Sequence, residues 1–274
     1  MINHSVFEIE NSKRLFDWQK KNIVDLLNLI NKSFDSPKKI RILDIGCSVE
    51  ELNIMSHYVK SIVGINTYFP KNPQNITLNS NVTVLKMDGT DLKFLSNEFD
   101  FVYSLNVFEH IQNLSKAIDE KLRVTKRNGY CYAKWYPIWS GPRGHHVHDD
   151  VSMVKTWEKE TNCKKSIYKN NGFFIPDWSH LLLDKKEMSE KLLPKLKNKK
   201  LVEKIVDYIY ENNDINRIFF DEVIKVINNK KIKIIFLNKN TIKEPNNEIR
   251  KKLIKRYNYS DFSTIECETL FQKK

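Results

Sequence analysis

Glycine, paired cysteines and long apolar segments are all scarce in this chain. Its 274 residues include seven glycines and four cysteines. The cysteines lie far apart and form no CxxC pair, so we expect neither a zinc knuckle nor a disulfide framework. A reducing, cytoplasmic environment fits this pattern best. The four cysteines are Cys47, Cys131, Cys163 and Cys267.

Apolar runs are too short to span a bilayer, and the first residues lack the charged, apolar and small segments of a signal peptide. We therefore expect no membrane partner. The formal net charge of +12 raises the question of nucleic acid. The basic residues are mostly Lys, spread among Asn and Ile, a pattern that an AT-rich coding sequence also produces. A nucleic-acid partner is therefore not the preferred interpretation.

The chain is organised around the segment Arg41–Ser48. The aliphatic residues of Ile40–Leu43 predict a buried parallel strand that stops at Asp44 and turns sharply through Gly46. Apolar residues at helical spacing follow in Val49–Val59, so the turn is expected to open a helix. A strand, a glycine turn and a helix begin a nucleotide-binding βαβ unit. The dinucleotide motif G-x-G-x-x-G is absent, because Gly46 is the turn's one glycine.

Four further segments predict the strands of the same sheet, each followed by polar or turn residues. A strong Asn-Gly turn signal precedes the last of them. These strands are expected at Ser61–Ile65, Val82–Lys86, Phe99–Ser104 and Tyr130–Lys134.

Residues 40–135 resemble class I S-adenosylmethionine-dependent methyltransferases. In that family a turn like the one at Gly46 wraps the methionine end of the cofactor. The fourth strand of the family is typically Phe-Asp followed by aliphatic residues, as at Phe99-Asp100, and a Glu-His pair such as Glu109-His110 commonly follows it. The resemblance implies a Rossmann-like, mostly parallel sheet with an antiparallel last strand. It also implies S-adenosyl-L-methionine as the cofactor.

The resemblance places the cofactor at the ends of these strands. Asn66 stands where the family usually has an acid that accepts hydrogen bonds from the ribose, and a charged acceptor there would bind about twice as strongly. An Asp at position 66 is therefore expected to tighten cofactor binding. Asp88 resembles the residue that accepts from the adenine amino group. The implied cofactor-binding residues are Asp44, Gly46, Cys47, Asn66, Thr67, Asp88, Gly89, Ser104, Leu105 and Asn106.

The segment Trp135–Asp150 is expected to face the reactive methyl group, because ligands of open α/β sheets bind beyond the carboxyl ends of the strands. Three histidines fall within four of its residues. In the preferred interpretation, His145 or His146 is a general base that takes a proton from an attacking hydroxyl. In the second, the histidines and Arg143 bind an anionic substrate such as a phosphate ester.

A third interpretation makes the same histidines, with Asp149-Asp150, the ligands of a divalent metal. It is not preferred, because neighbouring loop residues rarely all point inward, and we assign no metal site. His110 receives a minor role. The residues expected to bind the substrate are Tyr136, Trp139, Arg143, His148 and His180.

The remaining segments predict a cover, a lid and the closing strands. Residues 1–37 are expected to form an N-terminal helical cover. Residues 38–150 and 231–274 are expected to form the Rossmann-like domain. Residues 151–230 read as a helical insertion that excludes water from the substrate site. Two late strands, 231–236 and 265–271, are expected to form an antiparallel hairpin, with the final strand between two earlier ones.

The sequence thus predicts an enzyme that methylates a small molecule. The chain resembles methyltransferases encoded with bacterial capsule or surface-glycan genes, which implies O-methylation of a sugar, nucleotide-sugar or phosphate or phosphoramidate precursor. One alternative is an RNA methyltransferase, although the Asn/Asp-Pro-Pro-aromatic run of amino-methylating enzymes is missing at 104–107. Another is a non-catalytic binding protein. The oligomeric state is left open.

Overall fold

The computed structural model describes residues 9, 15–70, 78–147, 151–162 and 175–274. Among these residues, no helix is both long enough and apolar enough to cross a membrane.

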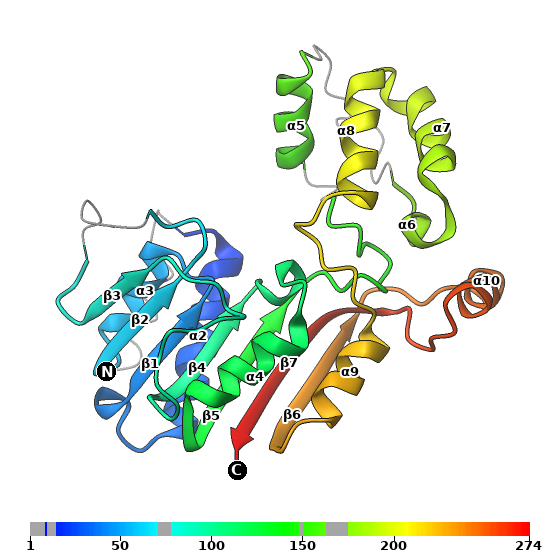
Figure 1. Ribbon diagram of the computed structural model, residues 1–274. Helices are drawn as coiled ribbons and strands as arrows, with labels where there is room; N and C mark the ends of the chain where they lie inside the picture. Colours follow the sequence, from blue (N-terminus) through cyan, green and yellow to red (C-terminus); the bar gives the residue numbers. More distant parts are fainter. Residues whose placement is uncertain (1–8, 10–14, 71–77, 148–150, 163–174) are drawn as a thin grey trace.

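In the described part of the chain, a seven-stranded sheet forms the centre of the fold (Figure 1). The strand order is β3-β2-β1-β4-β5-β7-β6, and β7 runs antiparallel to both of its neighbours. This order confirms the predicted class I methyltransferase sheet, including the insertion of the final strand between two earlier ones. The strands are β1 (Arg41–Ile45), β2 (Ser61–Ile65), β3 (Val82–Leu85), β4 (Phe99–Leu105), β5 (Thr125–Trp135), β6 (Ile232–Thr241) and β7 (Thr264–Lys273).

Helices cover both faces of the sheet. On one face, α2 and α3 bury aliphatic side chains such as Leu26 and Leu52 against β1, β2 and β4. On the other, α4 and α9 pack together over β5 and β7, with Ile118 and Val223 in the shared core. The covering helices are α2 (Asp17–Ser33), α3 (Val49–Ser56), α4 (Leu114–Val124) and α9 (Phe220–Asn228).

Strand β1 continues past the acid at which we expected it to stop. Asp44 pairs with Gly64 of β2 and Tyr103 of β4, and its side chain is 3% exposed. Burial raises the pKa of Asp44 well above its usual range, and the charge of Glu51 acts in the same direction. A protonated carboxyl is a neutral hydrogen-bonding group, so the strand tolerates it. The turn then forms at Gly46.

Four helices form a cap above the carboxyl ends of the strands (Figure 1). The cap has a core of its own, which includes Leu192 and Ile205. Helix α7 begins with the capping box predicted at Asp184 and Glu187. The cap consists of α5 (Val151–Glu160), α6 (Ser179–Leu182), α7 (Lys185–Leu196) and α8 (Lys199–Tyr210); α10 (Asn247–Tyr257) lies between β6 and β7 in the chain. The predicted domain limits stay a prediction.

Candidate functional site

A cleft of about 580 Å³ opens at the carboxyl ends of β1, β2 and β4. Strand β1 lies between β2 and β4, so the connections run outward in opposite directions on its two sides. Such a switch point is where open α/β sheets bind ligands. The cleft is lined by Ile45, Gly46, Ile65, Asn66, Thr67, Tyr68, Met87, Asp88, Gly89, Thr90, Asn106, Val107, His110, Ile111, Gln112, Asn113, Asn213 and Asp214.

The first wall of the cleft is the turn at Gly46. This residue has φ of +87°, and a Cβ atom there would lie 2.2 Å from Cγ2 of Val107. The position therefore needs glycine for its conformation and for its contact. The amide of Gly46 donates to the Ile65 carbonyl at 2.8 Å, which fixes the turn to β2. Ser48 then caps α3 through a reciprocal bond with Glu51.

Asn66 joins the two strand ends at the centre of the cleft. Its Nδ2 donates to the carbonyl of Cys47 at 3.1 Å, and its Oδ1 accepts from the amide of Tyr68 at 3.1 Å. The first of these bonds requires an amide donor, which a carboxylate lacks. The structure thus gives a physical reason for Asn at this strand end: it fastens the turn after β1 to the end of β2.

Asp88 and Asn106 line the cleft from the ends of two other strands. Asp88 Oδ1 accepts from the amide and the hydroxyl of Thr90, at 2.7 and 2.8 Å. Both bonds use one carboxylate oxygen, so the other can accept from a ligand. Asn106 has φ of 52°, and its amide donates to the Lys134 carbonyl at 2.8 Å. This left-handed backbone sits at a ligand-facing position, as strained residues often do.

Four predicted cofactor residues are not among those that line the cleft. Cys47 Sγ donates to the Ile65 carbonyl at 3.6 Å, and Asp44 is buried beneath the turn. Ser104 accepts from Nζ of Lys121 at 3.0 Å, and Leu105 packs in the core on the α2 side. These four side chains support the floor of the cleft, and their contact with a cofactor stays a prediction.

The outer wall of the cleft joins two distant parts of the chain. His110 Nδ1 lies 2.6 Å from the carbonyl oxygen of Asp214, and Gln112 Nε2 donates to the carbonyls of Asn213 and, at 3.1 Å, Ile215. Asn216 donates from Nδ2 to the carbonyls of two residues near η2 (Phe108–His110), at 2.6 and 3.0 Å. We call residues 212–217 the clamp segment. It holds the end of α8 over the cleft.

The predicted catalytic histidines lie behind this wall. His145 is fully buried, and its Nδ1 accepts from the Val147 amide at 3.1 Å. The ring of His146 packs edge-on against the ring of His110, with 4.9 Å between centroids. His110 lines the cleft, whereas His145 and His146 are not among the lining residues. Their role as bases stays a prediction.

Two of the predicted substrate residues, Trp139 and His180, lie in a buried cluster and are not among the residues that line the cleft. His180 Nε2 hydrogen-bonds to the Trp139 carbonyl at 2.8 Å, and its ring lies 5.4 Å from the ring of His145. Burial lowers the pKa of His180 to about 4, so its imidazole is neutral near pH 7. Arg143 lies 3.6 Å from the carboxylate of Asp177.

The other two predicted substrate residues are Tyr136 and His148. Tyr136 is half-buried just beyond β5. His148 lies outside the described residues, as do Asp149 and Asp150 of the metal alternative.

Sequence reasoning missed the cap side of the cleft. Asn213 and Asp214 are more than a hundred residues from His110 in the chain, and no motif marks them. Glu109 was named in the Glu-His motif without a role. Burial raises the pKa of its carboxyl well above the usual range.

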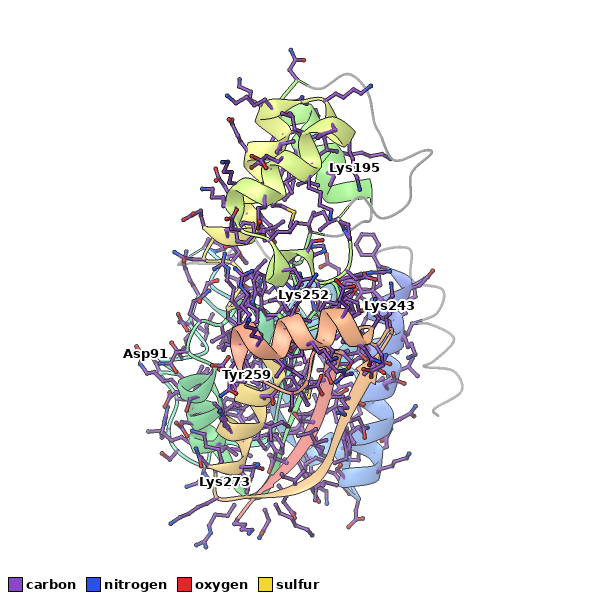
Figure 2. The ribbon with its side chains drawn as sticks, turned by 90° about the vertical axis from the view of Figure 1, so that its right-hand side faces the viewer. Asp91, Lys195, Lys243, Lys252, Tyr259 and Lys273 are labelled. Carbon is purple, nitrogen blue, oxygen red and sulfur yellow. The ribbon has the colours of Figure 1, made fainter. Side chains whose placement is uncertain are left out.

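The charge of the cleft differs from that of the chain. Its described lining contains two carboxylates, Asp88 and Asp214, five carboxamides and one imidazole, and none of these lining residues is Lys or Arg. Most of the described lysines lie instead on the outer surface, although Lys121 is buried. Figure 2 shows them from Lys195 on the cap through Lys252 on α10 to Lys273 at the end of β7. The net charge of +12 therefore does not describe this site.

The described lining fits a nucleoside-bearing cofactor such as S-adenosylmethionine. Gly46 and Gly89 both line the cleft without a side chain, and an added Cβ there would meet neighbouring side chains at 2.2 and 3.0 Å. The Asp88 carboxylate suits an amino group, and the Asn66 oxygen has a second lone pair for a hydroxyl. The carboxamide of Asn106 can bind an amino-acid end. These lining residues therefore suit the adenine, ribose and amino-acid parts of one such cofactor.

Comparison with known proteins agrees with this assignment. Residues 43–133 match the family model described as a methyltransferase domain. A 64-residue part of the chain is 38% identical to an uncharacterized methyltransferase of Mycolicibacterium vanbaalenii, covering 23% of this chain and 25% of that protein. The match thus spans about a quarter of the relative's length.

Solved structures share the fold at low sequence identity. An S-adenosylmethionine-dependent methyltransferase from Mesorhizobium loti aligns with a TM-score of 0.50 at 10% identity, covering 89% of this chain and 96% of that one. The [4+2]-cyclase SpnF aligns with a TM-score of 0.50 at 14% identity, covering 96% and 84%. A shared fold does not fix the reaction. The domain match and the cleft together support an S-adenosylmethionine-dependent methyltransferase.

Proposed function

We propose that this chain, whose residues 43–133 carry a methyltransferase domain, transfers a methyl group from S-adenosylmethionine to a hydroxyl of an uncharged sugar. The observation that carries the proposal is the lining of the cleft. It offers carboxylates, carboxamides and hydroxyls, and its described residues include no Lys or Arg. Such groups bind hydroxyls and oppose phosphate.

The charge of this lining favours an uncharged sugar over the phosphate-bearing acceptors that the sequence also predicts. A phosphate or phosphoramidate group at the outer end of the cleft would meet Asp214 without a described cation in the lining to offset its charge. Arg143, expected to bind such a group, lies beside Asp177 instead. A sugar remains compatible with the predicted place in surface-polysaccharide synthesis, and we retain that place as part of the proposal.

The same reasoning bears on the RNA alternative. A protein that binds nucleic acid neutralises phosphates with Lys and Arg at the contact surface. The described cleft lining carries the opposite charge, and the lysines are distributed around the molecule (Figure 2). These observations favour a small uncharged acceptor over RNA.

When bound, the cofactor would supply a methyl group activated by its sulfonium. The turn at Gly46 and the side chains of Asn66, Asp88 and Asn106 would hold it. The clamp segment covers the outer end of the cleft, which helps to exclude water. Positioning of this kind supplies much of the rate of an in-line displacement.

The acceptor's proton needs a base, and His110 is the imidazole in the described lining. Its Nδ1 faces a carbonyl oxygen, which only accepts, so Nδ1 carries the proton of the neutral ring. The lone pair is then on Nε2, which would take the hydroxyl proton as the new O–C bond forms. His146 packs against the His110 ring and holds its orientation. His146, one of the two histidines predicted as bases, is therefore proposed to position the His110 ring.

The proposal is tested with methyl-labelled S-adenosylmethionine and three acceptor sets: uncharged methyl glycosides, the matching sugar phosphates, and total RNA. We expect transfer to a glycoside. His110→Gln should lower kcat by about 100-fold or more while calorimetry shows unchanged cofactor affinity. His57→Gln, an exposed histidine at the end of α3, is the matched control and should keep full activity. Transfer to sugar phosphates or RNA alone would overturn the proposal.

A further inference from the structure

A second hollow lies in the cap, outside the cleft. It has a volume of about 340 Å³ and is lined from α5, α8 and the residues after α8. We call it the groove. Its residues are Trp157, Lys204, Asp207, Tyr208, Glu211 and Asn212.

The groove adjoins the mouth of the cleft. Asn212 lines the groove, and the next two residues, Asn213 and Asp214, line the cleft, so the two hollows share a wall. Burial, together with the charges of Asp214 and Tyr68, raises the pKa of Tyr208 to about 12. Both of these groups belong to the lining of the cleft, which places Tyr208 beside its outer end. Figure 1 shows α8 descending from the cap toward the sheet at this point.

The chemistry of the groove is aromatic and charge-paired. The rings of Trp157 and Tyr208 meet edge to face, with 5.1 Å between centroids, and both are half-buried. Asp207 and Glu211 share one cation, with Lys185 Nζ at 2.8 and 3.2 Å.

The groove's own cation is paired as well, because Lys204 bonds with Glu160. A wall whose charges are already paired does not select an ion. Aromatic rings with neighbouring carboxylates and a carboxamide suit an uncharged ring that has one apolar face and hydroxyls at its edge.

We infer that the groove is a subsite for the sugar unit next to the one that is methylated. The acceptor is then an oligosaccharide or a glycosidically extended sugar rather than a free monosaccharide. This inference rests on the proposed function and specifies that its acceptor has more than one sugar unit.

The test compares KM for two forms of each sugar that is methylated, the methyl glycoside and the corresponding trisaccharide. We expect KM for the trisaccharide to be lower by about tenfold or more. Glu211→Gln and Tyr208→Leu should each raise the trisaccharide KM toward that of the glycoside. Neither should change kcat/KM for the glycoside. Thermal melts confirm that the variants fold.

Glu203→Gln is the matched control. Like Glu211, this carboxylate is exposed; it lies on α8, 3.8 Å from Lys199, outside the groove. It should leave both KM values unchanged. Equal KM values for the two forms in the unaltered protein, or an advantage that survives both groove variants, would overturn the subsite while leaving the proposed function standing. Absence of transfer to every sugar would instead end the proposed function, and the subsite with it.

Discussion

Replacing Asn66 by Asp tests how the cofactor side of the cleft is held together. The change removes the bond from Nδ2 to the Cys47 carbonyl, now 3.1 Å long, and sets a carboxylate oxygen against that carbonyl. A lost hydrogen bond together with an unsatisfied neighbour costs about 2 kcal/mol. For a chain of this size that corresponds to a fall in Tm of roughly 4–8 °C.

The control is Thr67→Asp, which adds the same charge one residue later at an exposed position. The difference in Tm between the two variants measures the effect of the lost hydrogen bond. The deficit should shrink as the pH approaches 4, because a protonated Asp can again donate to the carbonyl. Calorimetry should show weaker cofactor binding, since the turn is loosened. An unchanged Tm, or the tighter binding that strand-end charge alone predicts, would refute this reasoning.

Three further predictions concern the turn, the clamp segment and the buried cluster. Gly46→Ala should cost about 2–4 kcal/mol, from its positive φ and its contact with Val107, and adding Val107→Ala should recover about half in denaturant titrations. Asn216→Ala should speed hydrogen exchange of residues 212–217 and leave exchange in β1 and β4 unchanged. Because burial holds the His180 pKa at about 4, below its unfolded value, stability should fall as pH drops from 6.5 toward 4, by up to about 1.4 kcal/mol per pH unit. His180→Gln should remove that slope, and a slope that persists unchanged would contradict the assignment.

The sheet could be read from the sequence because its signals are local. Aliphatic runs followed by turn residues mark β1 to β4 to within a few residues, whereas β5 begins at Thr125, so the Asn-Gly pair expected as a turn lies inside that strand. Asp44 was the exception at β1. The rule that charged residues end strands failed there, because burial favours the neutral carboxyl. Local pattern carries no information about the neighbouring strands that bury this side chain.

The place of the cleft was predictable, since strand ends in this fold converge on one edge. Gly46, Asn66, Asp88 and Asn106 all line the cleft, and their contact with a cofactor stays a prediction. What sequence reasoning could not supply was the bonding of Asn66, whose partner Cys47 lies 19 residues away. Because of that contact, we expect Asn66→Asp to weaken cofactor binding, whereas the sequence alone predicts tighter binding.

The acceptor side was harder to predict, because long-range packing decides which histidine reaches the cleft. The triple-histidine segment carried the strongest compositional signal, yet His145 faces the cap core and contacts His180. The sequence around His110 predicted only a minor role for it. The clamp segment places it in the cleft through a bond to Asp214, about a hundred residues away.

The most direct test is a crystal structure of the protein with S-adenosylhomocysteine, the demethylated product of the cofactor. The account predicts the ligand in the cleft, with its adenine beside Asp88, its ribose beside Asn66 and its amino-acid end along Gly46 and Asn106. Density for the ligand elsewhere, or no binding at millimolar concentration, would contradict it.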